Sequence, residues 1–233
     1  LEAAGEATAL RDRHLDHFVA LAEAAEPGLA GDEQDRWLGL LKADHDNLRA
    51  ALDWGLALPD PGRARRLAAP LFWFWYLRGH TNEGVDYLRR AIERAPEEES
   101  PLQATLFTGV AAVSIASGRF DVLVEHAQKG LALASAIGDQ RNRGRCLLLL
   151  GVAMSYLDFD ASGDLLGQGA EAAAAAGDDL IADRILVMQG LLLGYRDRHD
   201  DAAPILQEGY ERCRRRGDRG FAAIALDYQV VAA

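Results

Sequence analysis

Residues 117–151 read SGRFDVLVEHAQKGLALASAIGDQRNRGRCLLLLG, and this stretch decides the fold of the chain. It encodes one helix, a Gly-Asp turn and the first half of a second helix, and the flanking sequence repeats this plan. Small residues recur 39, 39 and 40 residues apart, at Ala91, Gly130, Gly169 and Gly209, and a helix does not favour the three glycines among them. The turn recurs 39 and 40 residues apart, as Gly138-Asp139, Gly177-Asp178 and Gly217-Asp218. Landmarks that share one register predict a stacked array of helical hairpins.

The Gly-Asp turns have a stereochemical explanation. Glycine adopts the left-handed conformation after a helix C-terminus, and aspartate caps the N-terminus of the next helix. The glycines inside the helices cost about 1 kcal/mol each relative to alanine. Because they recur in register, we expect two helix backbones to approach closely at these positions.

Hydrophobic periodicity predicts an all-α chain, because no stretch alternates with a period of two between turn residues. We expect a helix over 6–27 that Pro27-Gly28 ends, and another from about 32 to 56. The polar run 44–47 either kinks this second helix or caps a new one. The paired helices of four hairpins are predicted over 63–78 and 83–95, 102–117 and 121–136, 140–157 and 160–176, and 179–196 and 200–216.

The repeats divide the chain into two regions. Nothing in 1–58 matches the later repeat, so we expect an N-terminal helical cap or linker there and repeats over 59–233. The predicted repeats cover about 63–100, 101–139, 140–178, 179–218 and a truncated 219–233. The chain begins without methionine and stops inside a helical pattern. We therefore interpret it as a fragment of a longer protein.

Composition argues against several classes of function. With 49% hydrophobic and 26% charged residues, the chain is typical of a folded soluble protein. A net charge of -11 argues against nucleic acid as the partner of this segment, because phosphate contact needs a basic face. Cys146 and Cys213 lack CxxC spacing and are interpreted as reduced thiols. No apolar run reaches the roughly 18 residues of a membrane span, and we expect a cytoplasmic protein.

Several repeat positions resemble the tetratricopeptide repeat. Leu150-Gly151 matches the Leu-Gly pair of that repeat, and Phe120 and Phe159 match its turn aromatic. The period here is five or six residues longer than the usual period of about 34. The resemblance implies a right-handed superhelical array of helical hairpins. The remaining matches are Gly84, Ser162 and Ala202 at the first small position and Leu88, Leu166 and Leu206 at the large one.

The longer repeat, with its LALA…GD turn, resembles the C-terminal region of large bacterial ATP-binding transcriptional regulators. These are the LuxR-type and SARP-type signal-transduction (STAND) ATPases related to the maltose regulator. Residues 43–54 and 71–80 resemble the segments that lead into the repeats of this family. By implication, the nucleotide-binding and DNA-binding domains, with any ATPase activity, lie outside these 233 residues.

The tetratricopeptide resemblance also implies a ligand or partner groove lined by the first helix of each hairpin. The family often has asparagines where Leu148 and Leu149 stand, and their absence argues against recognition of a peptide backbone or carboxylate. An apolar groove edged by Arg145 and Arg184 suits an amphipathic helix of a protein partner, or an apolar small molecule with an anionic end. The groove residues carried over are Arg66, Trp73, Tyr76, Arg145, Leu148, Leu149, Tyr156, Arg184, Met188, Tyr195 and Tyr228.

No catalytic motif is present in the sequence. It has no GxxxxGK[ST] phosphate loop, no GxGxxG after a strand and no HExxH. His14 and His17 lack a third partner, so we expect no metal or cofactor in this fragment. The aromatic run 72–76 is either a core seam or a ligand shelf. One arginine group either complements a helix dipole or forms an anion site; it comprises Arg212, Arg214, Arg215 and Arg216.

Two hypotheses of function follow. In the first, the chain is the regulatory or sensor module of a multidomain bacterial transcriptional regulator. It would bind an effector or protein partner in the groove and bias an upstream ATPase switch, which requires different contacts in the two states. In the second, it is a scaffold or adaptor for protein-protein interaction without an allosteric role. We expect no enzyme activity from the fragment itself. A phosphate loop upstream in the full-length gene would separate the two hypotheses.

Overall fold

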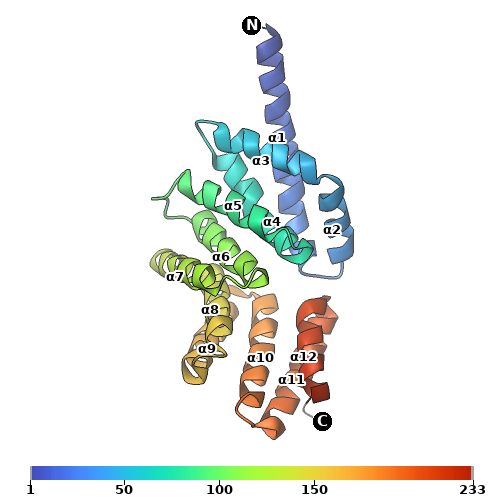
Figure 1. Ribbon diagram of the computed structural model, residues 1–233, viewed down its shortest axis with the longest axis vertical. Helices are drawn as coiled ribbons and strands as arrows, with labels where there is room; N and C mark the ends of the chain where they lie inside the picture. Colours follow the sequence, from blue (N-terminus) through green and yellow to red (C-terminus); the bar gives the residue numbers. More distant parts are fainter. Residues whose placement is uncertain (1, 232–233) are drawn as a thin grey trace. The chain divides into compact units, whose positions relative to one another are not determined.

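The computed structural model describes residues 2–231, which form helices α1 to α12 and no strand within that range. The prediction of an all-α chain is therefore confirmed. The chain divides into two compact units, one ending at Arg119 and the other starting at Phe120, which are coloured blue to green and green to red in Figure 1.

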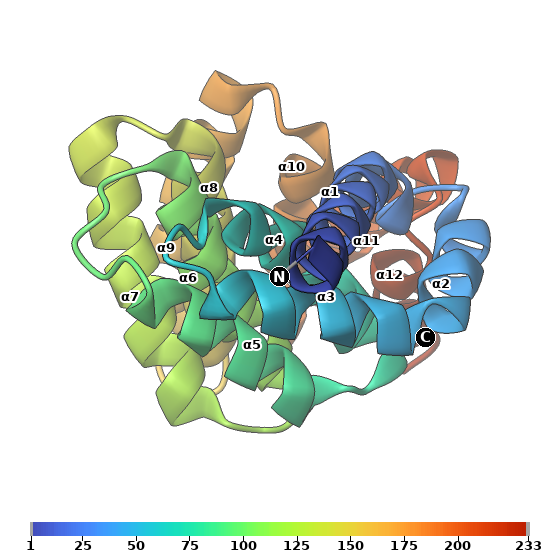
Figure 2. The same cartoon turned by 90° about the horizontal axis from the view of Figure 1, so that it is seen from above.

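The first unit contains six helices around an aromatic core. Helix α1 packs against α3 and α4, and α4 packs against α5 and α6 (Figures 1 and 2). Phe72, Phe74 and Trp75 of the aromatic run are buried, whereas Trp73 and Tyr76 are half-buried, so the core-seam interpretation holds for three of the five. The helices are α1 (Glu2–Leu29), α2 (Gln34–Ala43), α3 (His45–Ala57), α4 (Gly62–Arg78), α5 (Thr81–Glu93) and α6 (Pro101–Ala116).

The helix ends of this unit settle one open question and correct one prediction. Asp44 separates α2 from α3, so the run 44–47 begins a new helix. Pro27-Gly28 does not end α1, which continues to Leu29. Leu29 is only 1% exposed, and Gln34 Nε2 donates a 2.7 Å hydrogen bond to its carbonyl oxygen. Burial and this hydrogen bond stabilise the last turn of α1 beyond the proline.

The second unit is a stack of helical hairpins. Helix α8 packs against α7 and α9, α10 against α9 and α11, and α12 against α11. Among the first helices of successive hairpins, α10 also neighbours α8 on one side and α12 on the other. The predicted division into a cap over 1–58 and repeats over 59–233 stays a prediction. The helices are α7 (Phe120–Ile137), α8 (Gln140–Met154), α9 (Phe159–Ala176), α10 (Asp179–Gly194), α11 (His199–Arg216) and α12 (Arg219–Val231).

The Gly-Asp turns have the predicted geometry. The φ angles of Gly138, Gly177 and Gly217 are 73°, 62° and 79°, in the left-handed region. The aspartate that follows each glycine accepts a hydrogen bond from a backbone N–H in the first turn of the next helix. These donors are the N–H groups of Asn142 at 3.1 Å, Ile181 at 3.3 Å and Phe221 at 3.3 Å.

Two of the recurrent glycines inside the helices of this unit, Gly169 and Gly209, lie where another helix approaches closely, as predicted. A Cβ atom on Gly169 would lie 3.0 Å from Ile185 Cδ1, and one on Gly209 would lie 2.7 Å from Val187 Cγ2. Neighbouring helices are therefore too close at both positions for a larger residue without adjustment. Close packing offsets the low helix propensity of glycine.

Replacing a turn glycine and a mid-helix glycine by alanine should have opposite effects on stability. Gly177→Ala should lower the free energy of unfolding by about 1–2 kcal/mol, because alanine is strained at a left-handed φ. An added Cβ atom at position 177 has no neighbour within 4 Å, so the effect on stability comes from backbone strain and not from a steric clash with another residue. Gly167→Ala, inside α9 and equally open, should raise it by up to about 1 kcal/mol. Urea unfolding would measure both, and changes of the same sign would contradict this account.

Candidate functional site

Three predicted groove tyrosines meet on the second unit. The Oη atoms of Tyr156 and Tyr195 lie 3.3 Å apart, and the rings of Tyr195 and Tyr228 meet edge to face with centroids 6.0 Å apart. Tyr228 Oη lies 3.5 Å from His199 Nδ1. We call Tyr156, Tyr195 and Tyr228 the tyrosine face. Its rings offer apolar area together with polar hydroxyl groups.

The repeat register explains why these tyrosines meet. Tyr156 and Tyr195 occupy the same place, after the first helix, in successive hairpins 39 residues apart. Stacking of α8 against α10 therefore brings them side by side. Tyr228 comes from α12 and lies over Gly194, where a Cβ atom would be 1.9 Å from its Oη. Only glycine at position 194 leaves room for this ring.

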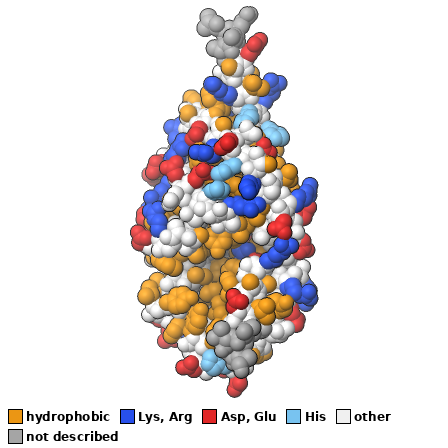
Figure 3. Space-filling view, turned by 45° about the vertical axis from the view of Figure 1, so that its right-hand side comes forward, with side chains coloured by type: hydrophobic (Ala, Val, Ile, Leu, Met, Phe, Trp, Pro, Cys, Tyr) orange, Lys and Arg blue, Asp and Glu red, His pale blue; other side chains and the backbone are white. Residues whose placement is uncertain are grey.

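An apolar floor supports the tyrosine face. Leu148, Met188 and Leu191 belong to one hydrophobic cluster, and Tyr195 and Tyr228 pack against it. Figure 3 shows hydrophobic side chains gathered over the second unit on the side it presents. Leu148, Leu149 and Met188 are 5%, 8% and 7% exposed, so little of these predicted groove residues reaches the surface. Their role in binding stays a prediction.

The exposed edge of the face lies at the α8–α9 turn. Tyr156 is 72% exposed and Leu157 79%, and Phe159 follows at the start of α9 with 37%. Arg196 lies over the Phe159 ring at 5.7 Å and pairs with Asp160. Large hydrophobic side chains this exposed are available for contact with another molecule.

Two tyrosines of the face, Tyr195 and Tyr228, have a raised pKa. Burial raises the pKa of Tyr195 to about 12, and its hydrogen bond with Tyr156 and the nearby Tyr156 and Tyr228 hydroxyls contribute. Burial, and then the charge of Asp197, raises the pKa of Tyr228. A phenol with the ordinary pKa of about 10 is already neutral at physiological pH, so the raised pKa values of Tyr195 and Tyr228 extend the neutral state to higher pH.

Arg145 and Arg184, predicted to edge the groove, are buried in ion pairs. Arg145 Nε lies 3.5 Å from Asp178 Oδ2, and Arg184 Nε donates to Asp218 Oδ2 at 2.6 Å. Each pair joins the first helix of one hairpin to the aspartate that caps the first helix of the next. We call this arrangement the arginine clasp. It favours a structural role for both guanidinium groups, whereas their role at a groove edge stays a prediction.

The first unit contains a related pair that the sequence analysis missed. Arg65 stands 80 residues before Arg145, is 2% exposed, and binds Glu98 and Gln103. Glu98 stands 80 residues before Asp178, and hydrogen bonds from Ser100 and then Arg65 lower its pKa. The shared spacing of arginine and carboxylate was the signal that could have revealed the clasp.

The other candidate residues of the first unit do not form a comparable cluster. Arg66 pairs with Glu23 on the surface at 2.7 Å, and the rings of Trp73 and Tyr76 meet edge to face at 5.9 Å. Across residues 2–231, no group of three or more His, Cys, Asp or Glu is placed to hold a metal ion. Nor is any helix in that range long and apolar enough to cross a membrane.

Sequence comparison relates the chain to part of much longer proteins. No family model matches it. Over 194 residues it is 26% identical to provisionally named HTH-type transcriptional regulators of Mycobacterium tuberculosis and Mycobacterium bovis. The match covers 77% of this chain, and the chain spans only 21% of the length of these relatives.

Two solved structures share the fold. BtubC (BKLC) from P. vanneervenii matches with a TM-score of 0.60 and 15% identity, over 89% of each chain. YrrB, described as a TPR protein with an unusual peptide-binding site, matches with a TM-score of 0.50 and 12% identity, over 91% of this chain and 98% of its own. The all-helical fold is thus that of tetratricopeptide-like repeat proteins, as predicted.

Breaking one arginine clasp should destabilise the protein strongly. Arg184→Met would leave the carboxylate of Asp218, which is 3% exposed, without its cation and should cost about 3–5 kcal/mol of unfolding free energy. The double variant Arg184→Met/Asp218→Asn should recover part of this loss, because the amide is neutral and still caps α12. The matched control is Lys129→Met, which removes an exposed ion pair with Glu125 and should cost at most about 1 kcal/mol. Denaturant unfolding would contradict the clasp if Arg184→Met and Lys129→Met cost the same.

The contact between Tyr156 and Tyr195 can be tested by phenolate titration. Tyr156→Phe should lower the pKa of Tyr195 from about 12 toward 10, without reaching 10 because burial remains. The raised pKa favours the neutral phenol in the folded state, so its contribution to stability is complete below pH 10 and is lost as the pH rises toward 12. Ultraviolet difference titration against Tyr195→Phe isolates this group. Tyr210→Phe, outside the tyrosine face, should leave its pKa unchanged.

Proposed function

We propose that this chain is the protein-interaction arm of a larger bacterial transcriptional regulator, and that the tyrosine face receives the partner. The observation that carries the proposal is the meeting of three tyrosines from successive hairpins over an apolar floor, with Tyr156 72% exposed at the edge. Tyrosine is suited to interfaces because it buries a large area and keeps a hydrogen-bonding group.

The chemistry of the face favours an amphipathic helix of a protein partner. Leu157 and Phe159 extend the apolar surface beyond the tyrosines, and Met188 beneath them can adapt its shape. An apolar small molecule is the alternative occupant. The peptide-binding site named for YrrB supports a peptide, although that likeness by itself concerns the fold.

The regulatory part of the proposal rests on the relatives. Their names place them among transcriptional regulators, and this chain matches about a fifth of their length. We infer a cytoplasmic protein of the LuxR-type or SARP-type STAND class, in which an upstream ATPase switch responds to the arm. A partner can bias that switch only if it contacts the two states differently. A scaffold with no such bias is the competing function.

A photo-crosslinking experiment tests where the partner binds. A photoreactive phenylalanine would replace Tyr156 in one variant and Leu40 in the other, the latter an exposed apolar residue of α2 at 41%. In cells that express the full-length protein, position 156 should crosslink to one defined partner and position 40 should not. Binding of that purified partner should fall about tenfold or more in Tyr195→Ala, because central aromatic residues dominate interface energy. Equal crosslinking at both positions, or unchanged binding in Tyr195→Ala, would exclude the face as the site.

The same partner then separates a regulator from a scaffold. ATP hydrolysis by the full-length protein would be measured with the partner and without it. A change that Tyr195→Ala abolishes supports the regulator. A rate that stays constant while the partner is bound supports the scaffold.

A further inference from the structure

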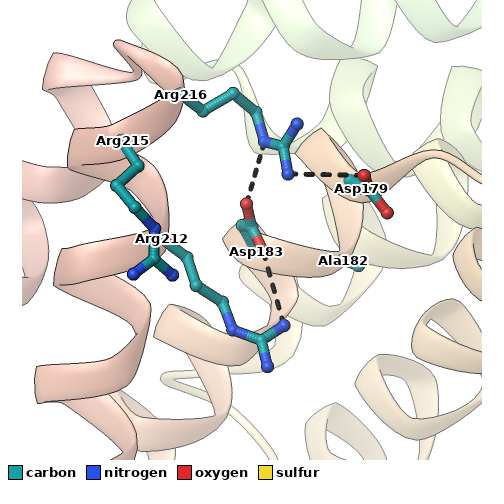
Figure 4. Close-up of a pocket in the computed structure, with 6 residues that line it drawn as sticks. All are labelled: Asp179, Ala182, Asp183, Arg212, Arg215 and Arg216. Carbon is teal, nitrogen blue, oxygen red and sulfur yellow. Dashed lines mark hydrogen bonds and ion pairs between the residues drawn. The ribbon is translucent and has the colours of Figure 1, made fainter.

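A second feature of the second unit is a hollow of about 370 Å³ between the start of α10 and the end of α11. It shares no residue with the tyrosine face. Figure 4 shows the side chains that surround it, with carboxylates on α10 opposite guanidinium groups on α11. The lining residues are Asp179, Ala182, Asp183, Arg212, Arg215 and Arg216.

A buried carboxylate positions two of the three arginines. Asp183 is 3% exposed, and its Oδ2 accepts a 2.9 Å hydrogen bond from Arg216 Nε while its Oδ1 lies 3.7 Å from Arg212 Nη1 (Figure 4). Arg216 also lies 3.5 Å from Asp179, and Arg212 pairs with Glu208. These ion pairs hold both guanidinium groups at the wall of the hollow.

Arg215 has no such counter-charge. Positions 212, 215 and 216 have the three- and four-residue spacing of one helix face, at which like charges repel. Asp183, Asp179 and Glu208 compensate Arg212 and Arg216. For Arg215, which is exposed, the structure records no ion pair with any residue of 2–231. The helix dipole explains cations at this end of α11 but does not explain a hollow lined by three of them.

We propose that this hollow binds a small oxyanion, the phosphate or carboxylate group of a ligand, with Arg215 as its main charge partner. Each guanidinium carries five N–H donors in a planar fork that matches an oxyanion. The carboxylates occupy only part of the donors of Arg212 and Arg216, so the remaining ones are available to the ligand. Asp183 is a positioning residue that fixes the two guanidinium groups before the ligand arrives.

The test uses inorganic phosphate and malonate as probes on the 233-residue protein. Each would be titrated at constant ionic strength while amide shifts of α10 and α11 are followed by nuclear magnetic resonance. Arg215→Gln should weaken binding about tenfold or more, the size expected for one charged hydrogen-bond partner. Arg214→Gln is the matched control, because Arg214 is the adjacent exposed arginine and does not line the hollow. Thermal unfolding should show both variants as stable as the parent.

The outcomes separate the two sources of the oxyanion. Saturable binding of phosphate alone assigns a phosphate-bearing ligand, and binding of malonate alone assigns a carboxylate; either supports the site if Arg215→Gln weakens it and Arg214→Gln does not. Equal weakening in both variants would indicate unspecific attraction to arginines and overturn the proposal. So would unchanged affinity in Arg215→Gln, or shifts that fail to saturate with either probe.

Discussion

In two of the three Gly-Asp turns the aspartate contacts two hairpins at once, and the stacking of α8, α10 and α12 depends on this double contact. In Asp178, Oδ1 accepts the N–H of Ile181 in its own helix and Oδ2 faces Arg145 of the preceding hairpin. Asp218 divides its oxygens in the same way between the N–H of Phe221 and Arg184. One side chain thus sets where a helix begins and which helix it follows. Because these carboxylates are buried, the loss of either contact would lower the free energy of unfolding substantially.

The first Gly-Asp turn shows how the arrangement varies. Asp139 caps its helix through Oδ1, but its Oδ2 accepts from the side chain of Asn142. In the register of Arg65, Arg145 and Arg184, the corresponding position of α6 is Thr105, which has no charge to offer. The cap alone is enough to start a helix, whereas the arginine adds the link to the preceding hairpin. The repeat therefore conserves the capping function while the clasp is optional.

The fold was predictable because local rules and repeat spacing agreed. Left-handed glycines, aspartate caps and close approaches at Gly169 and Gly209 all followed from residue type and register. The α2–α3 boundary stayed open because the polar run 44–47 suits either a kink or a cap, and in the structure Asp44 precedes α3 without a side-chain cap hydrogen bond. The end of α1 was misplaced because burial of Leu29 outweighs the breaking tendency of Pro27.

The candidate site was predictable only in part. The spacing of Tyr156 and Tyr195 was enough to bring two tyrosines together, and Tyr228 was found by the same transfer of repeat positions. The same transfer placed Arg145 and Arg184 at the groove edge, which stays a prediction, and it did not use the regular spacing between these arginines and the aspartates that they bind. The hollow next to Asp183 was also beyond prediction in shape, since it depends on how the end of α11 meets the start of α10.

The arginine clasp has a consequence for how such a chain can change over evolution. The α10–α11 hairpin presents Asp178 toward the hairpin before it and Arg184 toward the hairpin after it. Duplication or loss of one complete repeat keeps the spacing between neighbouring hairpins, so each clasp arginine again lies opposite a capping aspartate. An insertion of any other length would separate the arginine and the aspartate of the clasp. The array can accordingly lengthen or shorten in whole steps of about forty residues.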